Sequence, residues 1–245
     1  MKLIALDSSG LVASVVVMED DNLIAEYTIQ YKKTHSQTLL PMLDEVKKMI
    51  DLDLHTIDAI AISAGPGSFT GLRIGSATAK GLGFALKKPL IAVPTIEGLA
   101  YNFYGSSELI CPIMDARRGQ VYSGVFEFVK KNETNAEGST HYELKTIVPQ
   151  CAVTMDEMLT KLNELNRAVL FVGDGIPVFS EMIKEKLSVP YHLAPAHRNR
   201  QSAASVAALA QVYYRQGKIQ TAEEHEPEYL RLSQAERERL EKEQK

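Results

Sequence analysis

The chain has 245 residues, a formal net charge of −4 and a hydrophobic share of 45%, which together are typical of a globular protein. Because basic residues are not in excess, electrostatics do not favour tight, independent binding to nucleic acid. Only Cys111 and Cys151 occur, no apolar run is long enough to span a membrane, and the first residues lack a signal-peptide pattern. We therefore expect a cytoplasmic protein without a disulfide framework.

The first half of the chain predicts the element order βββαβα, with one strand and one helix added. Apolar runs indicate strands at residues 2–7, 12–19, 23–30, 59–64 and 90–93. Helical periodicity indicates helices at residues 35–50, 70–86 and 95–104. Thr34 and Gln37 fit a capping box for the first helix, and Ser68 is the expected N-cap of the second.

The second half of the chain predicts a similar order. Strands are expected at residues 109–114, 120–129, 141–148 and 168–172, and helices at 155–165, 178–187 and 203–214. Thr154 and Glu157 form a further capping box, and Gly217 is the expected C-cap of the last helix. Residues 130–140 are polar and are expected to form a loop.

An internal duplication accounts for the agreement between the halves. The pairs Asp7 and Asp115, Gly65 and Gly173, and Gly67 and Gly175 are each separated by 108 residues. The predicted fold is therefore α/β with two lobes facing a cleft, each a duplicated βββαβα unit with a mixed sheet. The predicted division is an N-terminal lobe at 1–104, a C-terminal lobe at 105–200, a helix at the lobe junction at 201–217 and a charged tail at 218–245.

A Gly-Pro-Gly turn at residues 65–67 joins a predicted buried strand to a predicted helix. Such a turn exposes backbone N–H groups at a helix N-terminus, which suits a phosphate or another anion. Further glycines follow inside the helix, at Gly71, Gly75, Gly81 and Gly83. Each costs up to about 1 kcal/mol relative to alanine, so we expect the helix to approach another backbone closely.

The sequence offers little support for a metal site or a nucleophilic serine. None of the six histidines lies four residues from another, the spacing that lets two share a helix face and a metal ion, so no metal is predicted. Ser68 stands one place too early for a G-x-S-x-G nucleophile elbow. Cys111 is expected to pack in the core, so no catalytic residue is predicted.

Five segments carry a resemblance to a known family. They are LDSS at 6–9, HSQ at 35–37 with Leu40 and Pro41, GPGSFTGLRIG at 65–75, MDARR at 114–118 and PEYLR at 227–231. The duplicated lobes with an aspartate after the first strand resemble the actin, sugar-kinase and Hsp70 ATPase superfamily, with its ribonuclease H-like lobes. Within it, the chain is similar to the bacterial TsaB family of tRNA threonylcarbamoyladenosine biosynthesis proteins. GPGSFTGLRIG is the most specific segment, and the resemblance covers all but the last dozen residues.

This resemblance implies a scaffold and activator without catalytic residues of its own. TsaB proteins are non-catalytic paralogues of the subunit that transfers a threonylcarbamoyl group to N6 of adenosine 37, in tRNAs that read A-starting codons. The implied partners are that metal-binding catalytic paralogue, an ATPase subunit and, through the complex, tRNA. A small-molecule kinase or ATPase of the same superfamily is the main alternative. A metallopeptidase is a weaker alternative, because the histidine spacing speaks against it.

The resemblance also marks a vestigial nucleotide cleft. Its expected residues follow the first and fourth strands of each lobe: Asp7, Ser8, Ser9, Asp115, Gly173 and Gly175. Two carboxylates facing a cleft suit Mg²⁺ held through water, so weak binding of ATP, ADP or Mg²⁺ stays open. However, Ser8 and Ser9 replace the usual glycine of this superfamily, and a side chain there would crowd a phosphate.

Two helices are expected to form a docking surface for the paralogue. Small residues repeat every four positions at Gly71, Gly75, Ala79 and Gly83, so another helix axis could come unusually near. The expected interface residues are Leu39, Met42, Leu43, Val46, Gly71, Gly75, Thr78, Ala79 and Leu82. The resemblance favours an intermolecular four-helix bundle, and without the partner the same surface would form a homodimer. The alternative is that these helices pack only on their own sheet.

The C-terminal region carries mixed charges. The runs at residues 223–226 and 236–242 are expected to be solvated. Tyr229, Leu230 and Arg231 are candidates for contact with the partner or with tRNA. Arg198 and Arg200 lie in a predicted loop beside His197, where contact with phosphate is a further possibility, although the overall charge makes tRNA binding by this chain alone weak.

Overall fold

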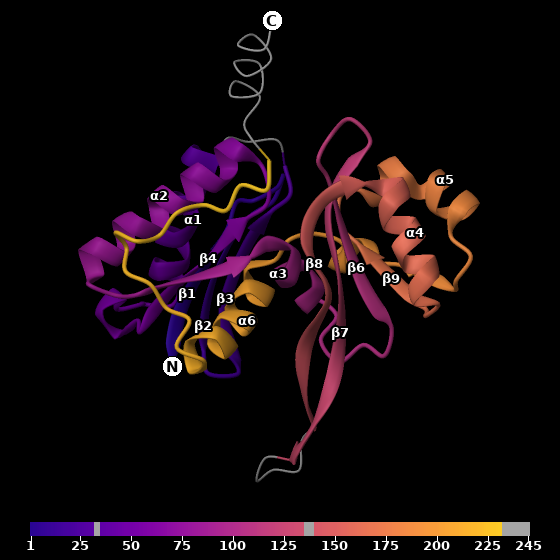
Figure 1. Cartoon of the computed structure of the whole chain (residues 1–245). Helices are drawn as coiled ribbons and strands as arrows, with labels where there is room; N and C mark the ends of the chain where they lie inside the picture. Colours follow the sequence, from indigo (N-terminus) through magenta and orange to yellow (C-terminus); the bar gives the residue numbers. More distant parts are fainter. Residues whose placement is uncertain (32–34, 135–139, 232–245) are drawn as a thin grey trace, which may run out of the picture.

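Two five-stranded sheets with the same strand order form the two halves of the molecule (Figure 1). The computed structural model describes residues 1–31, 35–134 and 140–231. The first sheet has the order β3-β2-β1-β4-β5 and contains β1 (Lys2–Asp7), β2 (Ala13–Glu19), β3 (Asn22–Ile29), β4 (Ala59–Gly65) and β5 (Leu90–Pro94). The second has the order β10-β9-β6-β7-β8 and contains β6 (Leu109–Asp115), β7 (Gln120–Thr134), β8 (Thr140–Thr154), β9 (Val169–Val172) and β10 (Tyr191–Leu193).

Both sheets combine an antiparallel part with a parallel part in the same sequence order. β1 pairs antiparallel with β2 and parallel with β4, and β6 pairs antiparallel with β7 and parallel with β9. The predicted α/β fold with two duplicated units is therefore confirmed.

Helices cover the outer faces of both sheets and fill the space between them (Figure 1). α1 (His35–Met49) and α2 (Phe69–Leu86) cover the first sheet, and α4 (Met155–Leu165) and α5 (Ile176–Lys186) cover the second. α3 (Thr95–Tyr101) and α6 (Ala203–Arg215) lie between the sheets. Two single-turn 3₁₀ helices, Leu54–Thr56 and Ala196–Arg198, complete the regular structure of the described residues.

Alternation along the strands explains how the first sheet is buried on both faces. In β1, Ile4 and Leu6 point toward α1 and α2, whereas Leu3 and Ala5 point toward α6. Side chains alternate between faces with a period of two, so a continuous apolar run supplies both cores.

The helices between the sheets connect the two halves. Ile96 and Leu99 of α3, which follows the first sheet, are buried in the core of the second sheet. Val206 and Leu209 of α6, which follows the second sheet, are buried against the first. Each half thus completes its core with a helix from the other half's stretch of sequence.

Most predicted elements appear with ends shifted by a few residues. Ser68 caps α2 by accepting a hydrogen bond from the Gly71 N–H at 3.3 Å, and Thr154 and Glu157 form the predicted capping box of α4. Gly217 follows the C-cap Gln216 of α6 with φ of +72°, as a terminating glycine does. The proposed cap Thr34 lies outside the described residues.

Two predictions were wrong in the second lobe. Of the expected loop at 130–140, residues 130–134 and 140 belong to β7 and β8, which pair out to Thr134 and Thr140, and residues 135–139 lie outside the described part of the chain. This hairpin extends beyond the body of the lobe (Figure 1), so its side chains are polar and lack the alternation that indicates a half-buried strand. The short strand β10 was missed, because only Tyr191–Leu193 pair with β9.

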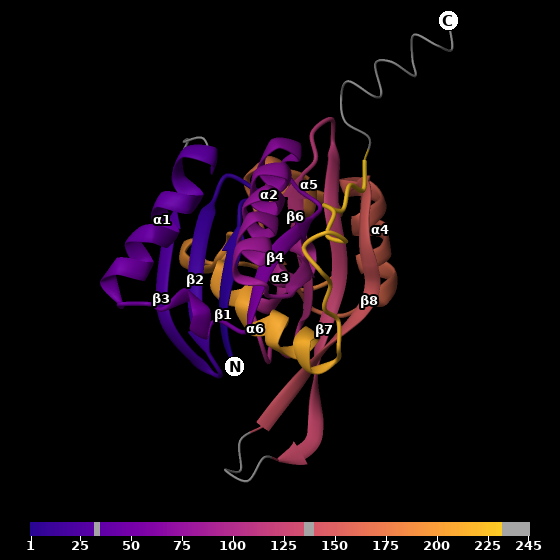
Figure 2. The ribbon, with the colours of Figure 1, turned by 90° about the vertical axis from the view of Figure 1, so that its left-hand side faces the viewer.

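The chain after α6 returns across the first lobe. We call residues 218–231 the C-terminal strap, drawn in yellow from the end of α6 to the far end of α2 (Figures 1 and 2). Gln220 exchanges two backbone hydrogen bonds with Leu90, at 2.8 and 3.0 Å. The Lys80 ammonium donates to the carbonyl oxygens of Glu223 and His225, at 3.2 and 2.9 Å. The strap is thus fixed to α2 and to β5.

Candidate functional site

The aspartate after β1 is turned into the protein. Asp7 is 2% exposed and accepts hydrogen bonds from the Ser9 N–H at 2.9 Å and the Ser9 hydroxyl at 2.7 Å. Burial raises the pKa of the Asp7 carboxyl above its ordinary value, and the bonds from Ser9 offset part of that rise. The carboxylate therefore orders its own loop. This position differs from the expectation from the sequence, in which Asp7 faces a cleft and a metal-bound water.

The N-terminus of α2 is occupied by the chain's own backbone. The Ser68 N–H donates to the Ser9 carbonyl oxygen at 2.7 Å. A Cβ at Gly67 would lie 2.3 Å from that oxygen, and a Cβ at Gly71 would lie 2.1 Å from the Ser8 carbonyl oxygen. The expected close approach to another backbone is confirmed, but the backbone is that of the loop after β1. These carbonyl oxygens occupy the space where a phosphate would bind, and their partial negative charge would repel it. The predicted phosphate cradle is therefore wrong for this chain.

The C-terminal strap closes over the same turn. The Glu228 N–H donates to the Ala64 carbonyl oxygen at 2.7 Å, and a Cβ at Gly65 would lie 2.2 Å from the Glu228 carbonyl oxygen. Gly65 has φ of +127°, which L side chains rarely adopt, so glycine is required there for two reasons. The strap thus covers the turn between β4 and α2 from the side of residue 228.

The equivalent residues of the second lobe bond among themselves. Asp115 accepts from the Arg117 N–H at 2.8 Å and pairs with the Arg117 guanidinium at 3.0 Å. Gly173 has φ of +122°, and a Cβ there would lie 2.2 Å from the Ile113 carbonyl oxygen. The Gly175 N–H donates to the same oxygen at 3.0 Å. Both lobes thus use their glycines for close backbone packing, and Asp7 and Asp115 each bond to residues of their own loop.

One half-buried acid of this region was not singled out from the sequence. Asp174 accepts a hydrogen bond from the Asp115 N–H at 3.1 Å. Burial raises the pKa of the Asp174 carboxyl above its ordinary value. Its position between two glycines, directly after β9, is the sequence feature that could have identified it.

Most of the expected interface residues are buried in this chain. Leu39, Met42, Leu43 and Val46 of α1 are at most 5% exposed and belong to the core beneath α1 and α2. In α2, a Cβ at Gly75 would lie 2.4 Å from the Ser8 hydroxyl oxygen, and Ala79 is fully buried. The small residues let α2 settle on its own sheet, so they are corrected from docking residues to internal packing residues. Thr78 and Leu82 are half-buried.

Other apolar side chains form the outer surface of α1 and α2. Leu40 and Met49 of α1 are 51% and 83% exposed, and Phe84 of α2 is 54% exposed. A Cβ at Gly81 would meet nothing within 4 Å. These four residues define what we call the outer helix face. Pattern analysis could not choose between the two sides of α1, because apolar residues cover a broad arc of that helix.

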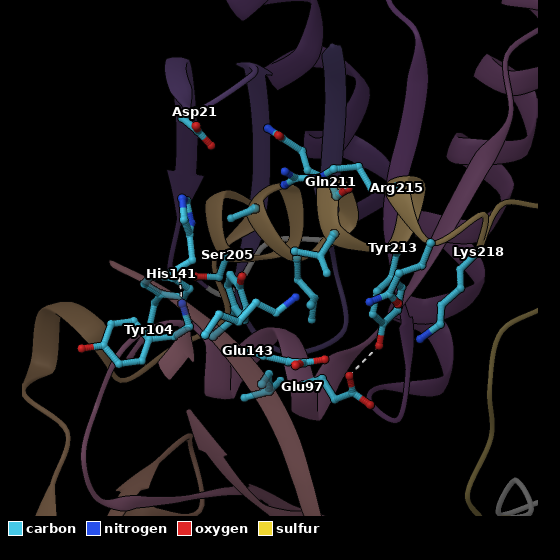
Figure 3. Close-up of a pocket in the computed structure, with 18 of the residues that line it drawn as sticks. Asp21, Glu97, Tyr104, His141, Glu143, Ser205, Gln211, Tyr213, Arg215 and Lys218 are labelled. Atoms are coloured by element: carbon cyan, nitrogen blue, oxygen red, sulfur yellow. Dashed lines mark hydrogen bonds between the residues drawn. The ribbon is translucent and has the colours of Figure 1, made fainter. Parts of the chain in front are cut away.

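A large cleft opens at the other end of β1, between α6, α3 and the start of β8 (Figure 3). It has a volume of about 1020 Å³, and the Tyr213 hydroxyl donates to the Glu97 carboxylate within it at 2.5 Å. Three acidic residues, Asp21, Glu97 and Glu143, and three basic residues, Lys131, Arg215 and Lys218, line it. The charges balance, so this cleft does not select a ligand of one sign.

Metal-ligating clusters and membrane-spanning helices are absent from residues 1–31, 35–134 and 140–231. Among them, no three His, Cys, Asp or Glu side chains gather in a way that could hold a metal ion. No helix among those residues has the length and apolar character needed to cross a membrane.

Nearly the whole chain is similar to known proteins of one tRNA-modification pathway. The family model for TsaD, described as tRNA N6-adenosine threonylcarbamoyltransferase, matches residues 22–239. The tRNA threonylcarbamoyladenosine biosynthesis protein TsaB of Bacillus subtilis is 33% identical over 96% of this chain and 96% of its own. The protein of the same name from Escherichia coli is 28% identical over 94% of this chain and 95% of its own. The solved structure of YeaZ from Pseudomonas aeruginosa, 25% identical, superimposes with a TM-score of 0.74 over 94% of this chain and all of that one.

Proposed function

Because the chain belongs to the TsaB family of tRNA threonylcarbamoyladenosine biosynthesis proteins, we propose that it is the non-catalytic subunit of a tRNA-modifying complex. That complex would transfer a threonylcarbamoyl group to N6 of adenosine 37. This subunit would hold the catalytic paralogue in its active arrangement, and an ATPase subunit would join the pair.

One observation carries the non-catalytic part of the proposal. The Ser8 and Ser9 carbonyl oxygens lie at the N-terminus of α2. The Ser9 oxygen accepts a hydrogen bond from the Ser68 N–H at 2.7 Å, and the Ser8 oxygen packs against Gly71. A phosphate bound at this helix N-terminus would need those N–H groups and that space. The buried Asp7, bonded to Ser9, likewise cannot direct a hydrated cation toward a phosphate.

The outer helix face supports the docking part of the proposal. Leu40, Met49 and Phe84 expose apolar area on two neighbouring helices that run parallel to each other, and exposed apolar area on a helix pair suits another helix pair. The partner would be the catalytic paralogue, and a second copy of this chain would use the same face when the paralogue is absent.

The test combines reconstitution with substitutions on the outer helix face. The chain, its paralogue and the ATPase subunit are purified separately and mixed, and modified adenosine in tRNA is quantified. We expect modification only when both paralogues are present. Phe84→Asp with Leu40→Asp should abolish pairing, whereas Val178→Asp, which alters an equally exposed apolar residue of α5, should not. Modification without this chain, or normal pairing of the double variant, would contradict the proposal.

The kinase or ATPase alternative makes a different prediction. It expects the isolated chain to hydrolyse or transfer phosphate from ATP, with the activity lost in Asp7→Asn. The scaffold proposal expects no turnover by the isolated chain, and it expects the complex containing Asp7→Asn to modify tRNA normally.

A further inference from the structure

The strap, the start of α2 and the turn between β6 and β7 meet at one end of the molecule. Arg231 of the strap donates to the Ala116 carbonyl oxygen in that turn, and Gln150 of β8 donates to the Glu228 carboxylate at 2.8 Å. Both views show the end of the strap and the β6–β7 turn at the same end of the molecule (Figures 1 and 2). A continuous surface therefore crosses from the first lobe to the second. We call it the strap-end surface and define it by Phe69, Arg73, Arg117, Arg118, Tyr229 and Arg231.

Aromatic rings and a guanidinium group are stacked on the first-lobe side of this surface. The rings of Phe69 and Tyr229 have centroids 4.8 Å apart, and the Arg73 guanidinium carbon lies 4.0 Å above the Phe69 ring. Arg73 also donates to the Tyr229 hydroxyl at 3.4 Å. Tyr229 stays 40% exposed, so the stack is fixed in place and part of a ring still faces solvent.

Two arginines on the second-lobe side have an unfavourable backbone conformation. Arg117 and Arg118 have φ of +65° and +58°, a region that non-glycine residues seldom occupy, and Gly119 follows at +72°. Such strain persists where the surrounding structure fixes it, and it is concentrated at ligand-binding positions. The turn projects the Arg117 side chain outward, with 86% of its area exposed.

The local charge on this surface differs in sign from that of the whole chain, which is −4. Asp115 is matched by Arg117, and Glu228 is bonded to the Gln150 amide. Within the residues that the structure describes, Arg73, Arg118 and Arg231 have no carboxylate partner. Three such guanidinium groups beside an exposed ring combine the two contacts that single-stranded nucleic acid requires, with phosphates and with base faces.

We infer that the strap-end surface binds a single-stranded RNA loop, namely the anticodon loop of the tRNA whose adenosine is modified. The inference rests on the proposed function, because adenosine 37 lies in that loop. The arginines contact phosphates on both lobes, and the exposed Tyr229 ring stacks on an unpaired base. A chain with net negative charge would then contribute a local contact to a complex and would not bind tRNA tightly alone.

The experiment measures the affinity of the assembled complex for an unmodified tRNA transcript over a series of salt concentrations. We expect Arg73→Ala with Arg118→Ala to weaken binding at least about tenfold and to make the salt dependence shallower by about 0.7 per lost phosphate contact. The matched control is Lys145→Ala with Lys184→Ala, which removes the same charge from exposed positions elsewhere and should leave both quantities unchanged.

Substitutions at Tyr229 separate stacking from charge. Tyr229→Ala should weaken binding roughly 5- to 100-fold without changing the salt dependence, whereas Tyr229→Phe keeps the ring and should bind like the original chain. Assembly of each variant complex is checked by its mass in solution.

Three outcomes would be informative. Unchanged tRNA affinity in an intact variant complex would overturn the inference while leaving the proposed function in place. Loss of a protein subunit with unchanged tRNA affinity would overturn it in favour of a protein-binding surface. Modification of tRNA by a complex that lacks this chain altogether would instead refute the proposed function.

Discussion

Gly71 and Gly81 belong to the same helix but have opposite surroundings. A Cβ at Gly71 would lie 2.1 Å from a backbone oxygen of Ser8, and backbone cannot move aside cheaply. A Cβ at Gly81 would meet nothing within 4 Å. The first glycine is therefore required by packing, whereas the second only lowers the helix propensity of α2.

Alanine substitution at these two positions should change stability in opposite directions. Gly71→Ala should lower the free energy of unfolding by about 1–3 kcal/mol or more, because it overpacks the contact with Ser8. Gly81→Ala, the matched control, should raise it by about 0.5–1 kcal/mol. Urea unfolding followed by circular dichroism measures both, and equal effects would show that α2 does not pack on the loop after β1.

The buried carboxyl of Asp7 makes stability depend on pH. Its folded pKa is raised above the ordinary 3.8, so the folded state holds the proton more tightly than the unfolded state. Its contribution is fully present below pH 3.8 and is lost as pH rises through the folded pKa. Asp7→Asn keeps an acceptor for the two bonds from Ser9 and removes the buried charge.

We therefore expect Asp7→Asn to raise the free energy of unfolding at pH 7 by about 1 kcal/mol or more, relative to the original chain. The free energy of unfolding of the variant should also lose the decline with rising pH that begins near pH 3.8. Parallel pH profiles of the two chains would mean that Asp7 titrates normally.

Among the elements, the C-terminal strap contains an internal titratable group. His225 is 1% exposed, and its Nδ1 accepts from the Gln220 amide at 2.6 Å. Burial, and then the nearby Lys80 ammonium, lower the pKa of His225 below its ordinary 6.5, while Glu226 acts in the opposite direction. Stability from the neutral ring is thus present above pH 6.5 and is lost as pH falls through the folded pKa.

The strap should accordingly loosen in mild acid before the core does. Hydrogen exchange in residues 218–231, corrected for the intrinsic pH dependence of exchange, should accelerate as pH falls below 6.5, whereas exchange in β1 should not. His225→Gln should remove this pH dependence. An acid-induced acceleration that persists in the variant would assign it to another group.

Sequence patterns located the elements well where burial was strong, and poorly where it was weak. The apolar runs of β1 and β4 and the capping residues Ser68 and Thr154 gave those elements almost to the residue. The outer half of the β7–β8 hairpin was missed because exposed strands carry no periodic signal. The side of α2 that faces inward could not be predicted, since small residues at four-residue spacing suit both a partner and the helix's own sheet.

For the whole molecule, the two lobes should unfold together. Leu99 of α3 is 1% exposed within the core of the second sheet, and Leu209 of α6 is 2% exposed against the first. Leu99→Ala should cost about 2–5 kcal/mol through lost burial and a cavity. Leu40→Ala, at an exposed position, should cost less than about 0.5 kcal/mol.

The chain contains no tryptophan, so one introduced residue can report on each lobe. Tyr27→Trp reports on β3 and Tyr191→Trp on β10. We expect both reporters to show the same denaturation midpoint and to shift equally when Leu99→Ala is added. Separate midpoints would show that the lobes fold independently.

The sequence predicted which glycines of the two lobes correspond, but not which backbone atoms surround them. The offset of 108 residues correctly paired Gly65 with Gly173, which have nearly the same φ. That the Ser8 and Ser9 carbonyls fill the end of α2, and that residue 228 covers Gly65, depends on contacts between segments far apart in the chain. No local pattern encodes such contacts.

The helices α3 and α6 begin at Thr95 and Ala203, which are also 108 residues apart. A single ancestral unit with this helix would have left one face of its sheet bare, and two units could have covered both faces by exchanging helices, as in a domain-swapped dimer. Fusion of two such copies into one polypeptide would turn that bimolecular association into an intramolecular one. Completion of each core would then no longer depend on protein concentration.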